Sequence, residues 1–67
     1  MKTIGECIRE KRIEMGLKQY QLAAKLGINQ NTLSCYEKGK FFPNALLLCD
    51  MADFFKCTVD ELCGRNV

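Results

Sequence analysis

The amino-acid sequence predicts an all-α fold of five short helices, and three observations support that prediction. Apolar residues recur at intervals of three and four, which is the spacing of one helix face. No segment alternates apolar and polar residues between turn-forming pairs, as the strands of an antiparallel sheet do. Glycine, asparagine or threonine stands at most points where an apolar stripe begins or ends. The 67 residues are enough for one domain only, so we expect residues 1–67 to form a single unit.

The first predicted helix covers residues 4–15. Ile4, Ile8 and Met15 lie near one face of it at helical spacing, and most of the other side chains are charged. Gly16 follows directly, at the position where helices commonly end in the left-handed backbone conformation. The segment is therefore predicted to be an amphipathic helix with one buried face.

The second and third predicted helices are separated by a single short turn. The second covers about residues 18–26 and ends at Gly27. The third begins at Asn29, whose side chain is well suited to cap a helix, and ends at Lys38 before Gly39. Two short helices joined by a glycine-containing turn are the minimal helix-turn-helix, a motif that places its second helix in the DNA major groove.

Two further helices are predicted in the remaining residues. Asn44 can cap a fourth helix that runs to about Lys56, with an apolar stripe along one face. Thr58 and Glu61 form a capping-box pattern, which predicts a short fifth helix that ends at Gly64.

The outward face of the third helix carries amides and hydroxyls rather than the Glu and Lys of an ordinary solvated helix. Asn31 and Ser34 lie on this face, and Gln30 lies at its edge. Asn and Gln side chains can pair with both the donor and the acceptor that adenine presents in the major groove. Glu37 falls on the opposite, apolar face, where an unpaired carboxylate would be costly. The side chains of this helix therefore favour a surface that contacts DNA bases over an ordinary solvated helix face.

Charge is divided along the chain in a way that suits contact with a polyanion. Residues 1–40 contain eight basic and four acidic residues, whereas residues 41–67 contain two basic and four acidic ones. A basic part and an acidic part in one small protein indicate nucleic-acid binding by one face. Ordinary solvated helix faces are the alternative explanation for the charge pattern taken alone.

The composition argues against catalysis, metal binding and membrane insertion. Without histidine there is no Ser-His or Cys-His pair, and neither a phosphate-binding glycine loop nor a zinc-type cysteine spacing occurs. We therefore predict no enzyme activity, no cofactor and no metal site. No apolar run approaches the roughly 20 residues that span a bilayer. The N-terminal residues lack the apolar stretch of a secretory signal, so a cytoplasmic protein is expected.

The segment from Ile4 to Gly64 resembles the phage-repressor helix-turn-helix family, of the Cro/CI or Xre type. The elements that carry the resemblance are GLKQ at 16–19, LAAKLG at 22–27, YEKGK at 36–40, Pro43 and TVDELCG at 58–64. The resemblance implies a compact lambda-repressor-like domain with its helix-turn-helix at about residues 18–38. It also implies a transcriptional regulator, most simply a repressor, that reads double-stranded DNA with the helix at residues 29–38. The alternative is a protein-interaction module of the same fold, such as an antitoxin-like or bridging factor.

The resemblance also assigns roles to individual residues. The residues expected to read bases are Gln30, Asn31, Ser34 and Cys35. The residues expected to contact the DNA backbone are Lys18, Gln19, Asn29, Lys38 and Lys40. Arg12 and Glu37 match a partly buried ion pair that ties the first helix to the third.

Four features depart from the family pattern. Lys11 replaces a usual leucine, which thins the core. Lys18 stands where a Ser, Thr or Asn cap is usual, and we expect the loss of that cap to cost about 1 kcal/mol. Cys35 has no amide at a reading position and offers only a small apolar contact. Phe41 and Phe42 replace a polar or basic loop, which weakens the case for DNA backbone contacts there.

Five cysteines are many for a chain of this length. Cys49, Cys57 and Cys63 fall where the family has leucine or valine, so the resemblance implies small core residues at these positions. We expect Cys7 and Cys35 to be more exposed and, in a reducing cytoplasm, to be unmodified thiols. Sensitivity to oxidation is the alternative, because thiol reactivity follows exposure and thiolate character.

The C-terminal half has more apolar residues than one helix face needs. Those that could form a subunit interface are Phe42, Leu46, Leu47 and Phe54. One recognition helix reads too few base pairs to select one site in a genome, so we expect a homodimer, at least on DNA, bound to a palindromic operator. The same residues could instead pack beneath the C-terminal segment.

Overall fold

The computed structural model describes residues 3–63, which form five helices and, within that range, no strand. The helices are α1 (Ile4–Glu14), α2 (Gln19–Leu26), α3 (Gln30–Lys38), α4 (Ala45–Phe55) and α5 (Val59–Leu62). The predicted all-α class and the order of the helices are confirmed. The predicted end of the fifth helix at Gly64 lies outside the described residues.

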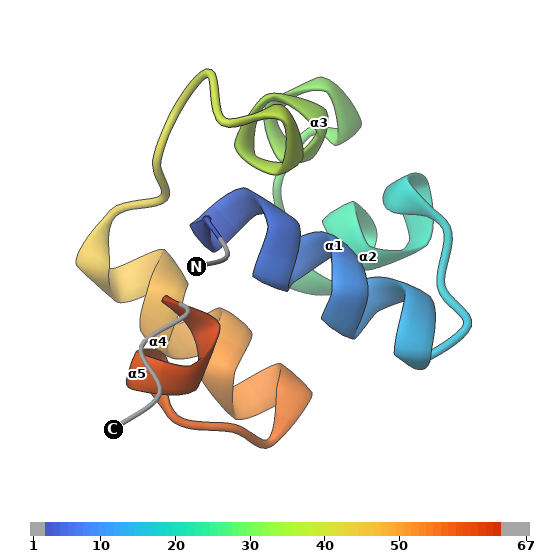
Figure 1. Ribbon diagram of the computed structural model, residues 1–67. Helices are drawn as coiled ribbons and strands as arrows, with labels where there is room; N and C mark the ends of the chain where they lie inside the picture. Colours follow the sequence, from blue (N-terminus) through green and yellow to red (C-terminus); the bar gives the residue numbers. More distant parts are fainter. Residues whose placement is uncertain (1–2, 64–67) are drawn as a thin grey trace.

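Helix α1 runs through the middle of the fold (Figure 1). It packs against α3 on one side and against α5 on the other, while α2 contacts both α3 and α4. A long loop, residues 39–44, connects α3 to α4 along the edge of the molecule (Figure 1). This arrangement leaves α3 at one end of the fold, with its far side turned away from the other helices.

The core takes one fully buried aliphatic side chain from each helix. These five side chains are Ile8, Leu22, Leu33, Met51 and Leu62, each with no accessible surface. Burying a side chain of this size stabilises a fold by about 1.5–3 kcal/mol. The core therefore fixes every helix, including the short α5, to the same centre.

Four of the five helix N-termini, those of α1, α3, α4 and α5, are capped by the side chain that precedes them. Asn29, Asn44 and Thr58 each accept a backbone N–H of the following turn, at 2.7, 2.8 and 3.1 Å respectively. A further cap lies at Thr3, whose hydroxyl accepts the N–H of Glu6 while the Glu6 carboxylate accepts the N–H of Thr3. This reciprocal capping box fixes the first turn of α1.

Three of the five helices end in the left-handed backbone conformation. Gly27 and Gly39 end α2 and α3, as predicted from the sequence, and have φ angles of 72° and 81°. Gly16, the position predicted to be left-handed after the first helix, follows the Met15 cap of α1 with φ 71°. Helix α4 ends at Lys56 with φ 56°, the one non-glycine residue with positive φ among residues 3–63. A left-handed backbone is costly for a residue that carries a Cβ.

Several sequence-based expectations about burial are wrong. Met15 is 48% exposed, because α1 ends at Glu14 and Met15 lies beyond its last turn. Cys7 is buried at 7% exposure, since it faces inward beside Ile8. Cys49 is exposed, because the buried stripe of α4 passes through Met51 and Ala52 instead.

The remaining cysteines are half-buried. Cys35 and Cys63 have intermediate exposure, and Cys57 packs against the core. Burial raises the pKa of the Cys57 thiol, and the nearby Lys11 ammonium partly offsets that effect. A raised pKa leaves less thiolate at neutral pH, so the Cys57 thiol is a poor nucleophile.

Candidate nucleic-acid interface

Helix α3 presents polar side chains on the side that faces away from the core. Leu33 points inward and is fully buried, whereas Gln30 and Asn31 in the first turn are exposed. Asn29 caps this turn by accepting the Asn31 N–H at 2.7 Å through its Oδ1, which leaves its amide N–H groups as donors toward solvent. The start of α3 is therefore a fixed turn that displays three amide side chains.

The other residues predicted to meet DNA lie along α3 and beside it. Ser34 and Cys35, one turn further along the helix, are half-buried, and Lys38 and Lys40 at its C-terminal end are exposed. Lys18, also exposed, precedes α2.

Glu37 forms a shielded ion pair with Arg12. The Arg12 Nε donates to Glu37 Oε2 at 2.7 Å and Nη2 donates to Oε1 at 3.0 Å, a bidentate geometry. The two side chains are only 12% and 3% exposed. The structure thus places Arg12 of α1 against the last turn of α3, and the pairing accounts for a carboxylate on the apolar face of the helix.

Two more hydrogen bonds extend this ion pair to α2. Gln19 Nε2 donates to Glu37 Oε1 at 3.2 Å, and Arg12 Nη1 donates to the Leu17 carbonyl oxygen at 2.8 Å. We call Arg12, Leu17, Gln19 and Glu37 the clamp. Among residues 3–63 every buried side-chain nitrogen and oxygen has a hydrogen-bond partner. The clamp therefore ties α1, the turn after it, α2 and α3 together without leaving a stranded polar atom.

The clamp changes the interpretation of Gln19. The family resemblance directs its side chain to a DNA phosphate, whereas in this structure the side-chain amide is bound to Glu37. Its backbone N–H lies in the first turn of α2, where helix N–H groups lack partners within the helix. Gln19 thus holds α3 through one amide hydrogen, and its second amide hydrogen and its backbone N–H remain as donors for the predicted phosphate contact.

The predicted loss of a cap at Lys18 is partly compensated. The Lys18 side chain makes no capping hydrogen bond, but its backbone N–H donates to the Gln21 side-chain oxygen at 2.8 Å. This is one half of a capping box.

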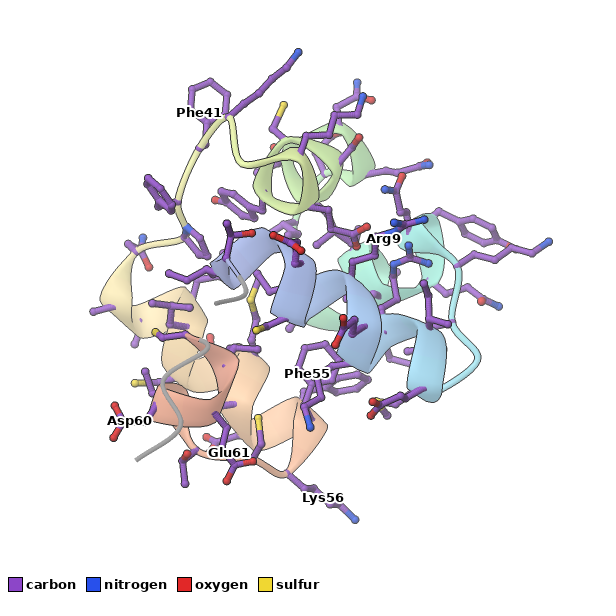
Figure 2. All side chains as sticks on the ribbon, in the orientation of Figure 1. Arg9, Phe41, Phe55, Lys56, Asp60 and Glu61 are labelled. Carbon is purple, nitrogen blue, oxygen red and sulfur yellow. The ribbon has the colours of Figure 1, made fainter. Side chains whose placement is uncertain are left out.

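The residues considered for a subunit interface fall into two groups. Phe42 and Leu46 are 72% and 75% exposed, whereas Leu47 and Phe54 are partly buried and pack against the core. Phe41 is also exposed, and its ring lies at the outer tip of the 39–44 loop, pointing away from the helices (Figure 2). The most exposed large apolar side chains among residues 3–63 therefore lie on this loop and at the start of α4, while Ile13, Met15 and Tyr20 are about half-exposed on and after α1 and on α2.

Two acidic side chains lie at the end of the molecule opposite α3. Asp60 and Glu61 project outward from α5, and Lys56 projects from the end of α4 (Figure 2). These two carboxylates are thus turned away from the side of α3.

Three contributors to the site were not found from the sequence. Thr3 caps α1, the Leu17 carbonyl oxygen joins the clamp, and Gly5 allows α1 to approach α3 closely. The pattern Thr-x-x-Glu at residues 3–6 could have revealed the cap. The sequence has no comparable pattern that would reveal the contact of the Leu17 carbonyl oxygen or the close approach of α1 to α3 at Gly5.

Comparison with known proteins places the chain in a family. A model of the helix-turn-helix family matches residues 8–62. The chain belongs to the helix-turn-helix family. The match includes all of α2 and α3, and the resemblance to phage repressors is confirmed by the relatives and the fold described next.

Two relatives illustrate this membership, and one solved structure shows the same fold. An uncharacterized HTH-type transcriptional regulator of Archaeoglobus fulgidus is 36% identical over 55 residues, which cover 82% of this chain and 79% of the relative. The cryptic phage CTXphi transcriptional repressor RstR of Vibrio cholerae is 34% identical over 92% of this chain and 55% of its own length. The P22 c2 repressor, solved with a synthetic operator, superposes with a TM-score of 0.90 at 24% identity, covering 98% of this chain and 100% of that one. The chain therefore has the lambda-repressor-like fold, and it spans about half of RstR.

No helix among residues 3–63 combines the length and the apolar character needed to cross a membrane.

Proposed function

We propose that this chain is a sequence-specific DNA-binding transcriptional regulator, acting as a repressor, whose helix α3 reads the major groove. One observation carries the proposal: the exposed turn with Gln30 and Asn31 stands on a helix whose inner side is buried and held by the clamp. A flexible polar surface could not discriminate between bases, whereas a fixed one can. The names of its relatives, which include a phage transcriptional repressor, support the same assignment.

The chemistry of α3 suits a major groove about 12 Å wide, which admits one helix. Gln30 and Asn31 can each donate to and accept from an adenine, and Cys35 can offer an apolar contact to a thymine methyl group. Nine helical residues extend over about 13 Å, enough to face four or five base pairs. Ser34 lies between Asn31 and Cys35 in the sequence, and its hydroxyl is the fourth group that we assign to base reading.

Contacts with the DNA backbone are assigned to groups around α3. Lys38 and Lys40 are exposed after its last turn, Lys18 is exposed before α2, and Asn29 keeps amide donors at the N-terminal end. Such contacts fix the protein on the duplex without reading sequence. Asp60 and Glu61 point away from this surface (Figure 2) and so stay clear of the phosphates.

We further propose that two copies bind a palindromic operator. One α3 helix reads too little sequence to select a site among the roughly 10⁶ or more competitors in a genome. Two helices related by a two-fold axis, about 34 Å apart, would double the contacts. The exposed Phe42 and Leu46 support a contact between copies, and the interface is small enough for pairing to depend on DNA. The proposal gives the chain one DNA-binding domain, no catalytic step and a place of action in the cytoplasm.

Repression follows from occupancy, since a protein held on the operator excludes polymerase from the same DNA. Selection of bound sequences from a random duplex pool tests the whole proposal. We expect enrichment of a two-fold symmetric sequence, whose half-sites lie one helical turn apart. A chain carrying Gln30→Ala and Asn31→Ala is the matched control and should enrich a more degenerate sequence. A pool that shows no enrichment with the parent chain would contradict the proposal and favour a protein-interaction module.

A further inference from the structure

Gly5 lies in the first turn of α1, against the last turn of α3. It is buried, and a Cβ built on its backbone would meet the Tyr36 carbonyl oxygen and lie 2.8 Å from that of Glu37. Ordinary contacts of a Cβ begin at about 3.4 Å, so even alanine requires the two helices to separate by more than half an ångström. Helix α1 can approach the backbone of α3 this closely only because residue 5 has no side chain.

Neither side of this contact can yield easily. The first turn of α1 is held by the reciprocal hydrogen bonds between Thr3 and Glu6. The Tyr36 carbonyl oxygen accepts the Gly39 N–H at 3.1 Å, as part of the left-handed end of α3. A methyl group at residue 5 would therefore displace whole helices rather than one peptide group.

The same face of α1 holds α3 at a second point. Arg12 lies seven residues after Gly5, which is two helical turns and the same side of the helix. Its guanidinium binds the Glu37 carboxylate, and Ile8, between the two points, is fully buried. Helix α1 thus contacts the last turn of α3 at two points. The backbone of α1 packs closely against it at Gly5, and the Arg12 side chain binds it through Glu37.

We propose that Gly5 is a positioning residue for base reading, because it sets the distance and tilt of α3 on α1. The inference rests on the proposed function. Gln30 and Asn31 lie at the opposite end of α3, so a shift of its last turn about the buried Leu33 changes where they point. Binding sites require their contacting groups to be held to about 0.5 Å and 10–20°. The displacement that a methyl group at residue 5 demands is of that size.

The test compares Gly5→Ala with Val59→Ala. Val59 lies in α5 and packs against the core, so its truncation lowers stability through lost apolar burial without altering the clamp or residue 5. For each folded variant, affinity is measured for the selected operator and for random duplex, and the ratio of the two is the readout. NMR chemical shifts of the α3 amides and of the Arg12 Nε–H are recorded without DNA.

We expect Gly5→Ala to lower the ratio tenfold or more, with random-duplex affinity changed less than twofold and with shifts throughout α3 and at Arg12. Val59→Ala should keep the parent ratio and leave the α3 shifts in place. A parent-like ratio in Gly5→Ala would overturn the inference. If Gly5→Ala does not fold, it is repeated with Lys56→Gly, which relieves backbone strain far from α3. A chain unfolded even then would make Gly5 a requirement of the fold and would also overturn the inference.

Failure of the proposed function has a different signature. In that case the parent chain itself enriches no duplex and shows a ratio near one, whatever stands at residue 5. The NMR comparison, which needs no DNA, would still report whether a methyl group at residue 5 moves α3.

Discussion

Helices α1–α3 and helices α4–α5 contribute fully buried apolar side chains to the same core, and the first group adds a charged hydrogen-bond network. In the first group the clamp joins Arg12, Glu37 and Gln19 through hydrogen bonds of 2.7–3.2 Å. In the second group Met51 and Leu62 are buried, while Leu47, Phe54 and other apolar side chains pack around them. The two regions are therefore held by different kinds of interaction.

This difference corresponds to what each region is proposed to do. Hydrogen-bonded charges have fixed distances and directions, so they define the orientation of α3 relative to α1 and α2. Apolar packing is less directional, and it tolerates changes that conserve volume. A reading surface needs the first kind of support, whereas the region at α4 and α5 needs only to close the core and to offer apolar surface to a second copy.

The largest effect is expected when one charge is removed from the clamp, and this change tests whether hydrogen-bonded charges support helices α1–α3. We expect Glu37→Gln to lower the free energy of unfolding by about 3 kcal/mol, because the Arg12 guanidinium is left largely buried without its anion. Urea denaturation measures the loss. Glu14→Gln, an exposed carboxylate at the end of α1, is the control and should change stability by less than about 0.5 kcal/mol. Equal stability of Glu37→Gln and the parent would show that the clamp is not a supporting element.

Substitutions on the exposed turn of α3 test what the clamp supports. Gln30→Ala or Asn31→Ala should each weaken operator binding by about 1–3 kcal/mol and relax the preference at one or two base positions. Lys38→Ala should weaken binding to all sequences alike and reduce the dependence of affinity on salt. Titration of operator and random duplex separates the two patterns. If Gln30→Ala lost the same amount of affinity for the operator and for random duplex, Gln30 would not be a base-reading residue.

A charge on the exposed apolar surface tests the other region. Leu46→Glu should leave folding nearly unchanged, since Leu46 is 75% exposed, but should reduce cooperativity on a two-site operator about tenfold, or about 1.4 kcal/mol. Leu47→Glu is the informative contrast, because Leu47 packs against the core and a charge there should also destabilise the fold. Operator titrations with one and two half-sites measure the effect. Saturation of the full operator by one copy of the parent chain would contradict pairing.

The sequence correctly predicted features that depend only on neighbouring residues in the chain. Asn29 and Asn44 were predicted as caps because a cap depends only on its own turn, and the structure shows both hydrogen bonds. Cys7, Cys49 and Gly5 were not read correctly or were missed, because their surroundings depend on which helix covers which face. Periodicity gives the angle of a residue around its helix, but it does not give the neighbour that the residue meets.

The same limit applies to the site. Glu37 could be recognised as anomalous because a carboxylate on an apolar face needs a partner, and the resemblance named Arg12. The hydrogen bond from Gln19 to Glu37 could not be foreseen, since it depends on how close α2 lies to the end of α3. The phosphate contact that the resemblance implies for Gln19 stays a prediction.

The smallest effect is expected at Lys56, where the structure of the C-terminal region carries strain. Lys56 has φ 56° at the end of α4, a conformation that costs a residue with a Cβ about 1–2 kcal/mol, while Gly27 and Gly39 end their helices without that cost. We expect Lys56→Gly to stabilise the fold by about 0.5–1 kcal/mol after the entropy lost by glycine is subtracted. Thermal melting should register a rise of a few degrees, and Gly27→Ala, at the equivalent end of α2, should shift the melting temperature in the opposite direction. Operator affinity should not change in Lys56→Gly, because the strain lies in the region that is held by apolar packing and far from α3 (Figure 2). A loss of operator discrimination in this variant would show that the two regions are mechanically coupled and that the contrast between them does not hold.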